Sequence, residues 1–268
     1  MKAVSFRLSG KTACFRKPDV NQFAYFTYNN THKPALLGLL GAIVGYGGYT
    51  KLYNQKMLLT EKIKNSNSKE KKLLQEKLSE IDLNMPEFYE KLQHLKVSIA
   101  PLAPYGYFSK KIQVFNNSVG YASQEEGGNL IVREQWLENP AWQILILDDG
   151  SSEYLKIREY ILNKKSVFVP YLGKNDHPAK IDDVKEIELN APIENAKISS
   201  LFIEDKFEIS KIPPRGELSY FFKEVSPVRL QEEYHFYEYE NLIFTNHKVI
   251  NSDLENTYSF DSENYFFL

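Results

Sequence analysis

The first predicted element is a strand at the start of the chain. Apolar and polar residues alternate from Lys2 to Leu8, which gives every second side chain to one buried face. This two-residue period is typical of a β-strand with one face on a core. Gly10 ends the alternation, and the polar, basic stretch that follows up to Asn30 predicts a long loop.

An apolar helix is predicted next, over the segment from Pro34 to Gly45. Thr31 is the expected N-cap, and a proline is tolerated in the first helical turn. The segment is apolar nearly all round, which predicts a buried helix. Gly38 and Gly41 leave one side of it without side chains, so we expect that side to approach a sheet closely.

A polar segment then interrupts the apolar pattern. It is rich in Lys, Glu, Asn and Ser between Leu52 and Asp82, and only a thin apolar stripe runs along it. We therefore predict an exposed helical insertion over residues 50–83, with a turn at Asn65–Ser68.

The following apolar stretches predict four strands, at 97–103, 107–115, 142–147 and 167–171, and a helix capped by Ser151 or Ser152. The glycine pair Gly127-Gly128 lies between strand-like stretches, which predicts a long β-hairpin, or thumb, over 107–137. Beyond residue 187 the pattern is almost purely that of short strands, with aromatic and acidic residues alternating near the end.

The resulting order, strand–helix–strand–strand–helix–strand, is that of a ferredoxin-like or RRM-like fold. We therefore predict an α+β protein. Its ferredoxin-like domain would span residues 1–180 and carry the insertion and the thumb. A small antiparallel β unit would form the C-terminal part, residues 181–268.

Composition adds that the chain is an ordinary globular protein, with 43% hydrophobic and 25% charged residues among 268. Its one cysteine, Cys14, excludes an internal disulfide and favours an intracellular location. The start of the chain lacks the pattern of a signal peptide, and the longest apolar run, 35–46, is too short to cross a bilayer. We expect a soluble, cytoplasmic protein with no membrane partner.

The near-neutral net charge of −2 conceals a division along the chain. Residues 1–120 hold 18 Lys and Arg against 8 Asp and Glu, whereas residues 121–268 hold 15 against 27. Half of the first excess lies in the lysine-rich segment 51–77, but the division persists without it. Such asymmetry favours a polyanionic partner for the first part of the chain.

The sequence lacks the usual markers of several activities. The phosphate-binding, dinucleotide-binding and serine-hydrolase signatures are all absent from the sequence. The five histidines lack ligand spacing, and the acidic pair Asp148-Asp149 has no third ligand nearby, so a solvated turn is the better interpretation. We predict no metal site and no cofactor.

The loop between Lys11 and Lys33 is the strongest candidate for binding. It interleaves basic residues with aromatic ones, a composition that suits single-stranded nucleic acid. An equally weighted alternative is that these aromatic side chains cover the core. The basic and aromatic residues concerned are Lys11, Phe15, Arg16, Lys17, Phe23, Tyr25 and Phe26.

Four segments taken together resemble a known family. They are V-S-F-R-L-S-G from Val4, F-R-K-P-D-V-N from Phe15, P-A-L-L-G-L-L-G-A-I-V-G from Pro34, and P-Y-L-G-K-N-D-H-P-A from Pro170. In this order they resemble the fifth Cas protein family (Cas-five) of type I CRISPR systems, closest to subtype I-B. The resemblance covers residues 1–179 apart from the insertion and implies a RAMP-type ferredoxin-like domain with a thumb.

The resemblance also implies a function. Members of this family are subunits of the Cascade surveillance complex in antiviral defence. They bind the 5′ handle of crRNA, cap the filament of Cas-seven backbone subunits and contact the large subunit, which makes target DNA near the PAM a possible partner. By hypothesis, the phosphates of the handle are held by the cations of the loop and of the helix start, Lys11, Arg16, Lys17 and Lys33. The cations of the thumb, Lys110, Lys111 and Arg133, would also contact the RNA.

Two alternatives remain open. In subtype I-C the family member itself cuts precursor crRNA without metal, and the residue types needed are present here in His32, Lys33 and Tyr25 or Tyr28. In subtype I-B a separate endonuclease does the cutting, so we favour a non-catalytic role. The third possibility is a free-standing single-stranded RNA-binding protein.

Overall fold

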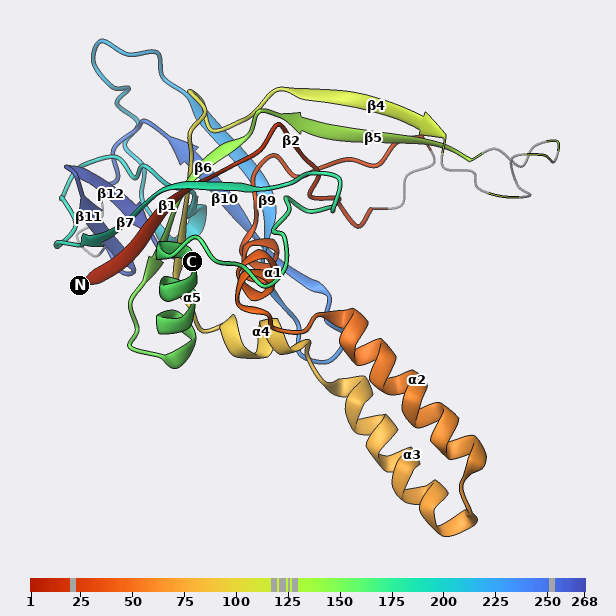
Figure 1. Ribbon diagram of the computed structural model, residues 1–268. Helices are drawn as coiled ribbons and strands as arrows, with labels where there is room; N and C mark the ends of the chain where they lie inside the picture. The colour runs from red at the N-terminus through yellow and green to blue at the C-terminus, as the bar shows by residue number, and fades with distance from the viewer. Residues whose placement is uncertain (20–22, 117–119, 121–123, 125, 127–129, 251–253) are drawn as a thin grey trace.

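The core of the protein is a four-stranded antiparallel sheet (Figure 1). In this computed structural model, which describes residues 1–19, 23–116, 120, 124, 126, 130–250 and 254–268, the sheet has the order β3-β6-β1-β7. Its strands are β1 (Lys2–Ser9), β3 (Val97–Pro101), β6 (Ala141–Leu147) and β7 (Lys180–Glu188). Every neighbouring pair is antiparallel.

Helices α1 (Lys33–Val44) and α5 (Ser152–Leu162) pack against one face of this sheet. Along the chain the elements follow the order β1, α1, β3, β6, α5, β7, which is the predicted strand–helix–strand–strand–helix–strand order. The core between the two layers is closed by side chains with no measurable exposure, among them Phe6, Leu40, Ile144 and Ile157. The predicted α+β fold is confirmed.

The strand predicted at Val167–Tyr171 is wrong. This segment lies against the end of α1, where the amides of Val167 and Phe168 donate to the carbonyl oxygens of Ile43 and Ala42. The carbonyls at the end of a helix need such partners, and an extended apolar run supplies them here. The fourth strand of the sheet is instead β7, which pairs with β1 from Lys180 to Glu188.

Two details of α1 also differ from the prediction. Its N-cap is His32 and not Thr31, because the His32 ring accepts a hydrogen bond from the Ala35 amide. The bare side of the helix meets a helix, α4 (Glu87–Leu92), and not the sheet: a Cβ at Gly41 would lie 2.4 Å from the Cβ of Phe88.

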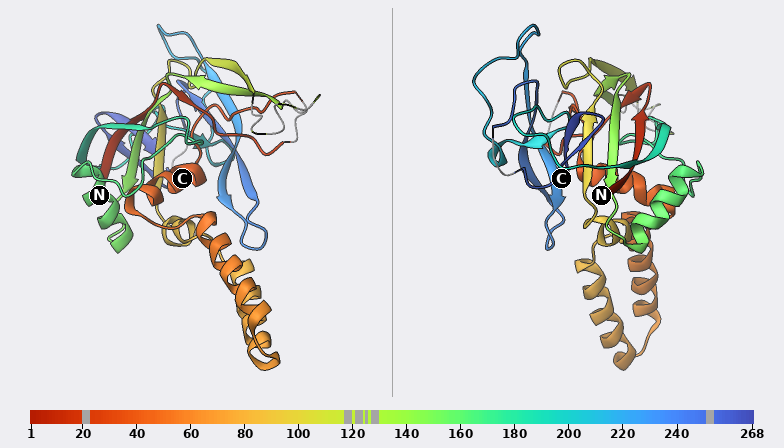
Figure 2. Two further views of the ribbon diagram at one scale, coloured as in Figure 1. Left: turned by 45° about the vertical axis from the view of Figure 1, so that its right-hand side comes forward. Right: turned by 90° about the vertical axis from the view of Figure 1, so that its left-hand side faces the viewer.

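The insertion is a pair of helices, α2 (Tyr49–Asn65) and α3 (Ser68–Leu83), which projects from the body as an arm (Figures 1 and 2). Helix α2 has no buried residue. Among the described residues, no single helix is long and apolar enough to span a membrane; α1 and α2 meet that description only as a pair bent by 72°.

The predicted thumb is the hairpin of β4 (Lys110–Asn116) and β5 (Ile131–Glu138), which extends away from the sheet in Figure 1. The predicted glycine pair of its turn, Gly127-Gly128, lies outside the described residues. The short strand β2 (Thr12–Ala13) pairs with the base of β5 and so joins the basic loop to the thumb.

The C-terminal part begins after β7 and not at residue 181 as predicted, because β7 belongs to the core sheet. The C-terminal part is antiparallel β structure. Strands β8 (Phe202–Ile203), β9 (Phe221–Leu230) and β10 (Tyr237–Thr245) form one sheet, and β11 (Thr257–Phe260) and β12 (Glu263–Phe266) form a hairpin. This part covers the second face of the core sheet, where Phe267 packs with Ala3, Leu145 and Ile187.

Candidate nucleic-acid interface

The basic loop lies along the edge of β5. The amide of Tyr25 donates to the carbonyl oxygen of Arg133 at 2.8 Å, and the amide of Gln135 donates to the carbonyl oxygen of Tyr25 at 2.8 Å. This short parallel bridge continues the edge that β2 begins at Thr12. The loop and the thumb therefore form one continuous surface.

Within the loop, cations stack on aromatic rings. The guanidinium carbon of Arg16 lies 3.4 Å from the centre of the Tyr25 ring, and Lys17 Nζ lies 5.1 Å from that of Tyr28. Such contacts hold a cation in one orientation without neutralising its charge. In the described part of the chain, no carboxylate lies within ion-pairing distance of Arg16, Lys17 or Arg133.

The aromatic side chains of the loop could, from the sequence, either bind nucleic acid or cover the core, and the structure shows both situations. Phe15 is buried in the core cluster. Phe23 and Phe26 are exposed, at 78% and 44%. The first therefore covers the core, whereas the other two present rings at the surface.

The Glu224 carboxylate of β9 interacts electrostatically with both Lys17 and Lys110. Burial lowers the pKa of Lys110, Glu224 opposes that effect, and the charge of Lys17 adds to it. The Glu224 carboxylate accepts hydrogen bonds from the Asn29 amide at 2.9 and 3.1 Å, while burial raises its pKa. Part of the positive charge is thus balanced inside the protein.

The three predicted thumb cations do not all lie on the same face of the thumb. The register places Lys110 opposite Leu137, Val114 opposite Arg133 and Lys111 opposite Trp136. Because side chains alternate along a strand, Lys110 and Arg133 share one face. Lys111 lies on the other, within 3.9 Å of Glu138.

Lys33 and Lys11 lie outside the cluster formed by Arg16, Lys17, Lys110 and Arg133. Lys33 Nζ donates to the carbonyl oxygen of Leu268 at 3.0 Å, and burial, with the charge of Lys96, lowers its pKa to about 8. It lines a different groove, together with Tyr89 and Leu230. Lys11 is exposed next to β2, and its carbonyl oxygen accepts from Asn139 at 2.9 Å.

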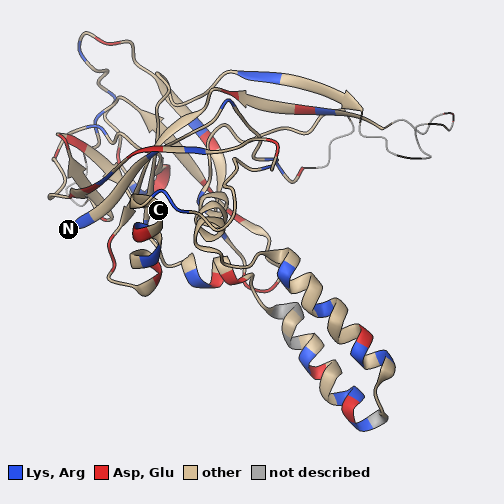
Figure 3. Ribbon diagram, viewed as in Figure 1, with Lys and Arg blue, Asp and Glu red and all other residues tan. Residues whose placement is uncertain are grey.

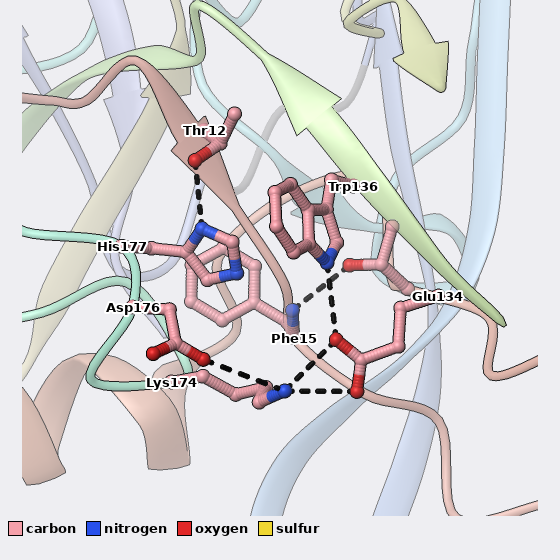
Figure 4. A network of polar contacts seen from close by, with 8 residues as sticks. Thr12, Phe15, Glu134, Trp136, Lys174, Asp176 and His177 are labelled. Atoms are coloured by element: carbon pink, nitrogen blue, oxygen red, sulfur yellow. Dashed lines mark hydrogen bonds and ion pairs between the residues drawn. The ribbon is translucent and has the colours of Figure 1, made fainter. Parts of the chain in front are cut away.

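A partly buried ion pair, which could not be predicted from the sequence, supports the face of the thumb that carries Trp136, its inner face (Figure 4). Lys174 Nζ lies 2.8 Å from both carboxylate oxygens of Glu134, and the Trp136 indole donates to the same carboxylate at 3.1 Å. Burial raises the pKa of Glu134, but these hydrogen bonds outweigh it and hold the pKa below its usual value.

The turn that carries Lys174 is fixed by two further contacts. His177 Nδ1 lies 2.7 Å from the Thr12 hydroxyl, and its ring packs on Trp136 with the centres 4.7 Å apart. Gly173 has a φ of +86°, and a Cβ there would lie 2.0 Å from the carbonyl oxygen of Cys14. The segment Pro170–Ala179, which the sequence marks only as part of the family resemblance, thus connects the thumb to the loop.

His32, the candidate base for RNA cleavage, is only 3% exposed. Its Nδ1 accepts from the Ala35 amide at 3.3 Å, and Phe15, Tyr28 and Tyr237 pack edge-on around its ring. Burial lowers its pKa to about 3, so the ring is neutral at physiological pH. In the structure it acts as a helix cap.

No group of three or more His, Cys, Asp or Glu side chains suited to a metal ion occurs among the described residues. Asp148 and Asp149 accept hydrogen bonds from the amides of Gly150 and Ser151, at 3.0 and 2.9 Å. Their carboxylates therefore shape the turn before α5.

No family model matches the sequence, and no curated protein matches it. Among solved structures, the chain is similar to CRISPR-associated proteins. A chain of a CRISPR RNA-guided surveillance complex matches with a TM-score of 0.48 and 11% identity, covering 93% of this chain and 91% of that one. A CRISPR protein from Archaeoglobus fulgidus matches with a TM-score of 0.40 and 11% identity, covering 99% and 98%.

A chain of the type III-B Cmr-beta complex, solved with cognate target RNA and AMPPnP, matches with a TM-score of 0.40 and 12% identity over 93% of this chain and 86% of that one. At 11–12% identity, these likenesses concern the fold alone.

Proposed function

We propose that this chain is a non-catalytic RNA-binding subunit of a type I CRISPR effector complex, of the I-B kind, and that it holds the 5′ handle of crRNA. The observation that carries the proposal is the pairing of Tyr25 with β5. It joins the cations of the loop, Arg16 and Lys17, to the thumb that bears Lys110 and Arg133. The sequence resemblance supplies the kind of complex and its other subunits as partners.

The combined surface has the chemistry that single-stranded RNA requires. Cations with no ion-pair partner among the described residues attract phosphates, and exposed rings such as Phe23 and Phe26 provide faces on which bases stack. Arg16 is already oriented by the Tyr25 ring, so its guanidinium loses little conformational freedom on binding a phosphate.

The core sheet is a poorer RNA surface than the loop and thumb. An RRM stacks bases on aromatic side chains of its open sheet face. Here the strand positions on that face hold Ala3, Ser5, Gln143 and Leu145, none of them aromatic. Phe267 of the C-terminal part packs on Ala3 and Leu145. This arrangement favours a complex subunit over a free-standing RRM-like protein.

A holding role also fits the surroundings of His32. A general base must reach the proton that it removes. The His32 ring is buried, and its Nδ1 is engaged by the helix amide. Cleavage through this residue would require the start of α1 to open.

The test is binding of a labelled repeat RNA in EDTA, resolved on native and denaturing gels. We expect the variant Arg16→Ala/Arg133→Ala to bind about tenfold or more weakly, with a shallower salt dependence. The matched control, Arg215→Ala/Lys248→Ala, removes two exposed cations elsewhere and should bind normally. Full affinity in the first variant would overturn the proposed interface. A discrete cut in the RNA would assign the endoribonuclease activity instead.

A further inference from the structure

The chain between α5 and β7 presents an exposed apolar patch. Val167, Phe168, Val169 and Tyr171 are 52%, 57%, 76% and 45% exposed. Single exposed apolar residues are common on soluble proteins, but a contiguous run marks a binding surface. Figure 1 shows this stretch running from the end of α5 across the end of α1.

The backbone beneath the patch is held in place. The Val167 and Phe168 amides donate to the end of α1 at 2.9 and 3.2 Å, and the Ala179 amide donates to the Pro170 carbonyl at 2.9 Å. Val167 also packs closely on the C-cap Gly45, where a Cβ would come within 3.0 Å of its side chain. The apolar side chains are therefore presented by a fixed frame.

A small cavity of about 140 Å³ adjoins the patch. Its apolar wall consists of Ile43, Ile161, Pro170 and Ile181, and residues 164–166 complete it. An apolar cavity of roughly 150 Å³ holds a benzene molecule. The cavity thus has room for one leucine or phenylalanine side chain.

The charge beside the cavity is positive. Lys165 is paired with Glu159 at 3.5 Å, but no carboxylate within the described ranges lies at ion-pairing distance from Lys164 Nζ. A ligand that fills the cavity would therefore be favoured by a negative charge next to its apolar group.

We propose that the patch docks a segment of a partner protein that inserts one leucine or phenylalanine side chain into the cavity, beside an Asp or Glu that pairs with Lys164. A few side chains that fill well-packed, desolvated pockets supply most of the binding energy of such contacts. The proposal also accounts for the sequence pattern: the run V-F-V-P, which predicts a buried strand, becomes buried in the complex. It does not depend on the proposed RNA-binding role.

The test uses short fluorescein-labelled peptides with a central leucine flanked by glutamates, the same peptide flanked by lysines, and a glutamate-flanked peptide with a central alanine. We expect the first to bind, and the other two to bind about tenfold more weakly. Phe168→Ser/Val169→Ser should weaken the first peptide about tenfold, and Lys164→Glu should reverse the preference between glutamate and lysine flanks.

Leu73→Ser is the matched control, because Leu73 is 55% exposed on the arm. All substituted side chains are exposed, and unchanged circular dichroism and repeat-RNA affinity would show that the fold and the RNA surface are intact. Equal binding of the three peptides, no binding of any, or equal weakening by Leu73→Ser would overturn the proposal. RNA binding or self-association that depends on Phe168 would also overturn it, by assigning the patch to RNA or to a second copy.

Discussion

The Tyr25 amide donates to the carbonyl oxygen of Arg133 at 2.8 Å, and this bond helps to join two parts of the chain that are remote in sequence. Because the loop is attached to β5 through its backbone, the position of Arg16 depends on how the thumb is seated. The position of the thumb depends in turn on the ion pair between Lys174 and Glu134, which attaches β5 to the segment Pro170–Ala179. If the loop and the thumb bind RNA as proposed, Lys174 and Glu134 should influence RNA binding from a position behind the interface.

Substituting Gly173 is expected to disturb this seating strongly. An alanine Cβ would lie 2.0 Å from the Cys14 carbonyl oxygen, and φ is +86°. We expect Gly173→Ala to lower the free energy of unfolding by at least about 2 kcal/mol, because strain and displacement of β2 add together. Repeat-RNA affinity should fall with it. Urea unfolding and gel-shift titration measure the two effects.

Gly216→Ala is the control. Gly216 has a φ of +79°, but nothing lies within 4 Å of its added Cβ, so only the backbone cost of about 1 kcal/mol is expected. Equal losses of stability in the two variants would show that the approach of Cys14 does not constrain the turn.

Lys174→Met should also be destabilising. Glu134 is 4% exposed, and removing its partner leaves a buried carboxylate without a counter-charge. Since Lys174 itself is partly exposed, we expect a loss of about 2–3 kcal/mol. Glu134→Gln/Lys174→Met should lose less than the sum of the single variants, as measured by urea unfolding. Strict additivity would contradict a direct coupling between the two side chains.

The elements with a regular pattern could be predicted from the sequence. The alternation at Lys2–Leu8 became β1, and the polar stretch around Asn65 became the turn of the arm. The run at Val167–Tyr171 misled the prediction, because periodicity records which residues are apolar and not whether the chain itself covers them. An apolar extended segment that faces solvent looks the same as a buried strand.

Only part of the candidate interface could be predicted from the sequence. Arg16 and Lys17 stand out locally, since cations and aromatic rings alternate around them. The Lys174–Glu134 pair could not be foreseen, because its members lie 40 positions apart and each belongs to an unremarkable local pattern. Lys33 was chosen for its place at the helix start, but the structure turns its side chain toward Leu268.

Acid should destabilise the protein through His32. Its pKa is lowered by burial from 6.5 to about 3, so the unfolded chain takes up a proton before the folded one does. This contribution to stability is fully present above pH 6.5 and is lost as the pH falls toward 3. Within that window, the free energy of unfolding is expected to fall by about 1.4 kcal/mol for each pH unit. Urea unfolding between pH 7 and pH 5 measures this change.

His32→Asn provides the comparison, since asparagine also caps helices. The variant should be less stable at pH 7, because it leaves space among Phe15, Tyr28 and Tyr237, but its stability should vary less with pH. Burial lowers the pKa of His177 as well, so a smaller slope of the same sign remains in the variant. An unchanged slope would mean that His32 is not the group that titrates.

Removing the arm should leave the rest of the protein folded. Helix α2 buries no residue, and the two ends of the arm are already joined, because the Phe88 amide donates to the Gly47 carbonyl oxygen at 3.1 Å and the Gly47 amide donates to the Glu87 carboxylate at 3.0 Å. We expect replacement of residues 49–84 by a short Gly-Ser linker to change the free energy of unfolding by less than about 1 kcal/mol.

Repeat-RNA affinity of the armless protein should stay within about threefold of the full chain at physiological salt, where screening limits the effect of the lost lysines. Thermal unfolding and gel-shift titration are the measurements. Retained folding with a large loss of affinity would place RNA on the arm, whose surface is rich in lysine (Figure 3). Such a result would move the interface away from the loop and the thumb, because Arg16 and Arg133 are untouched by the deletion. Normal affinity would instead leave the arm without a part in binding repeat RNA.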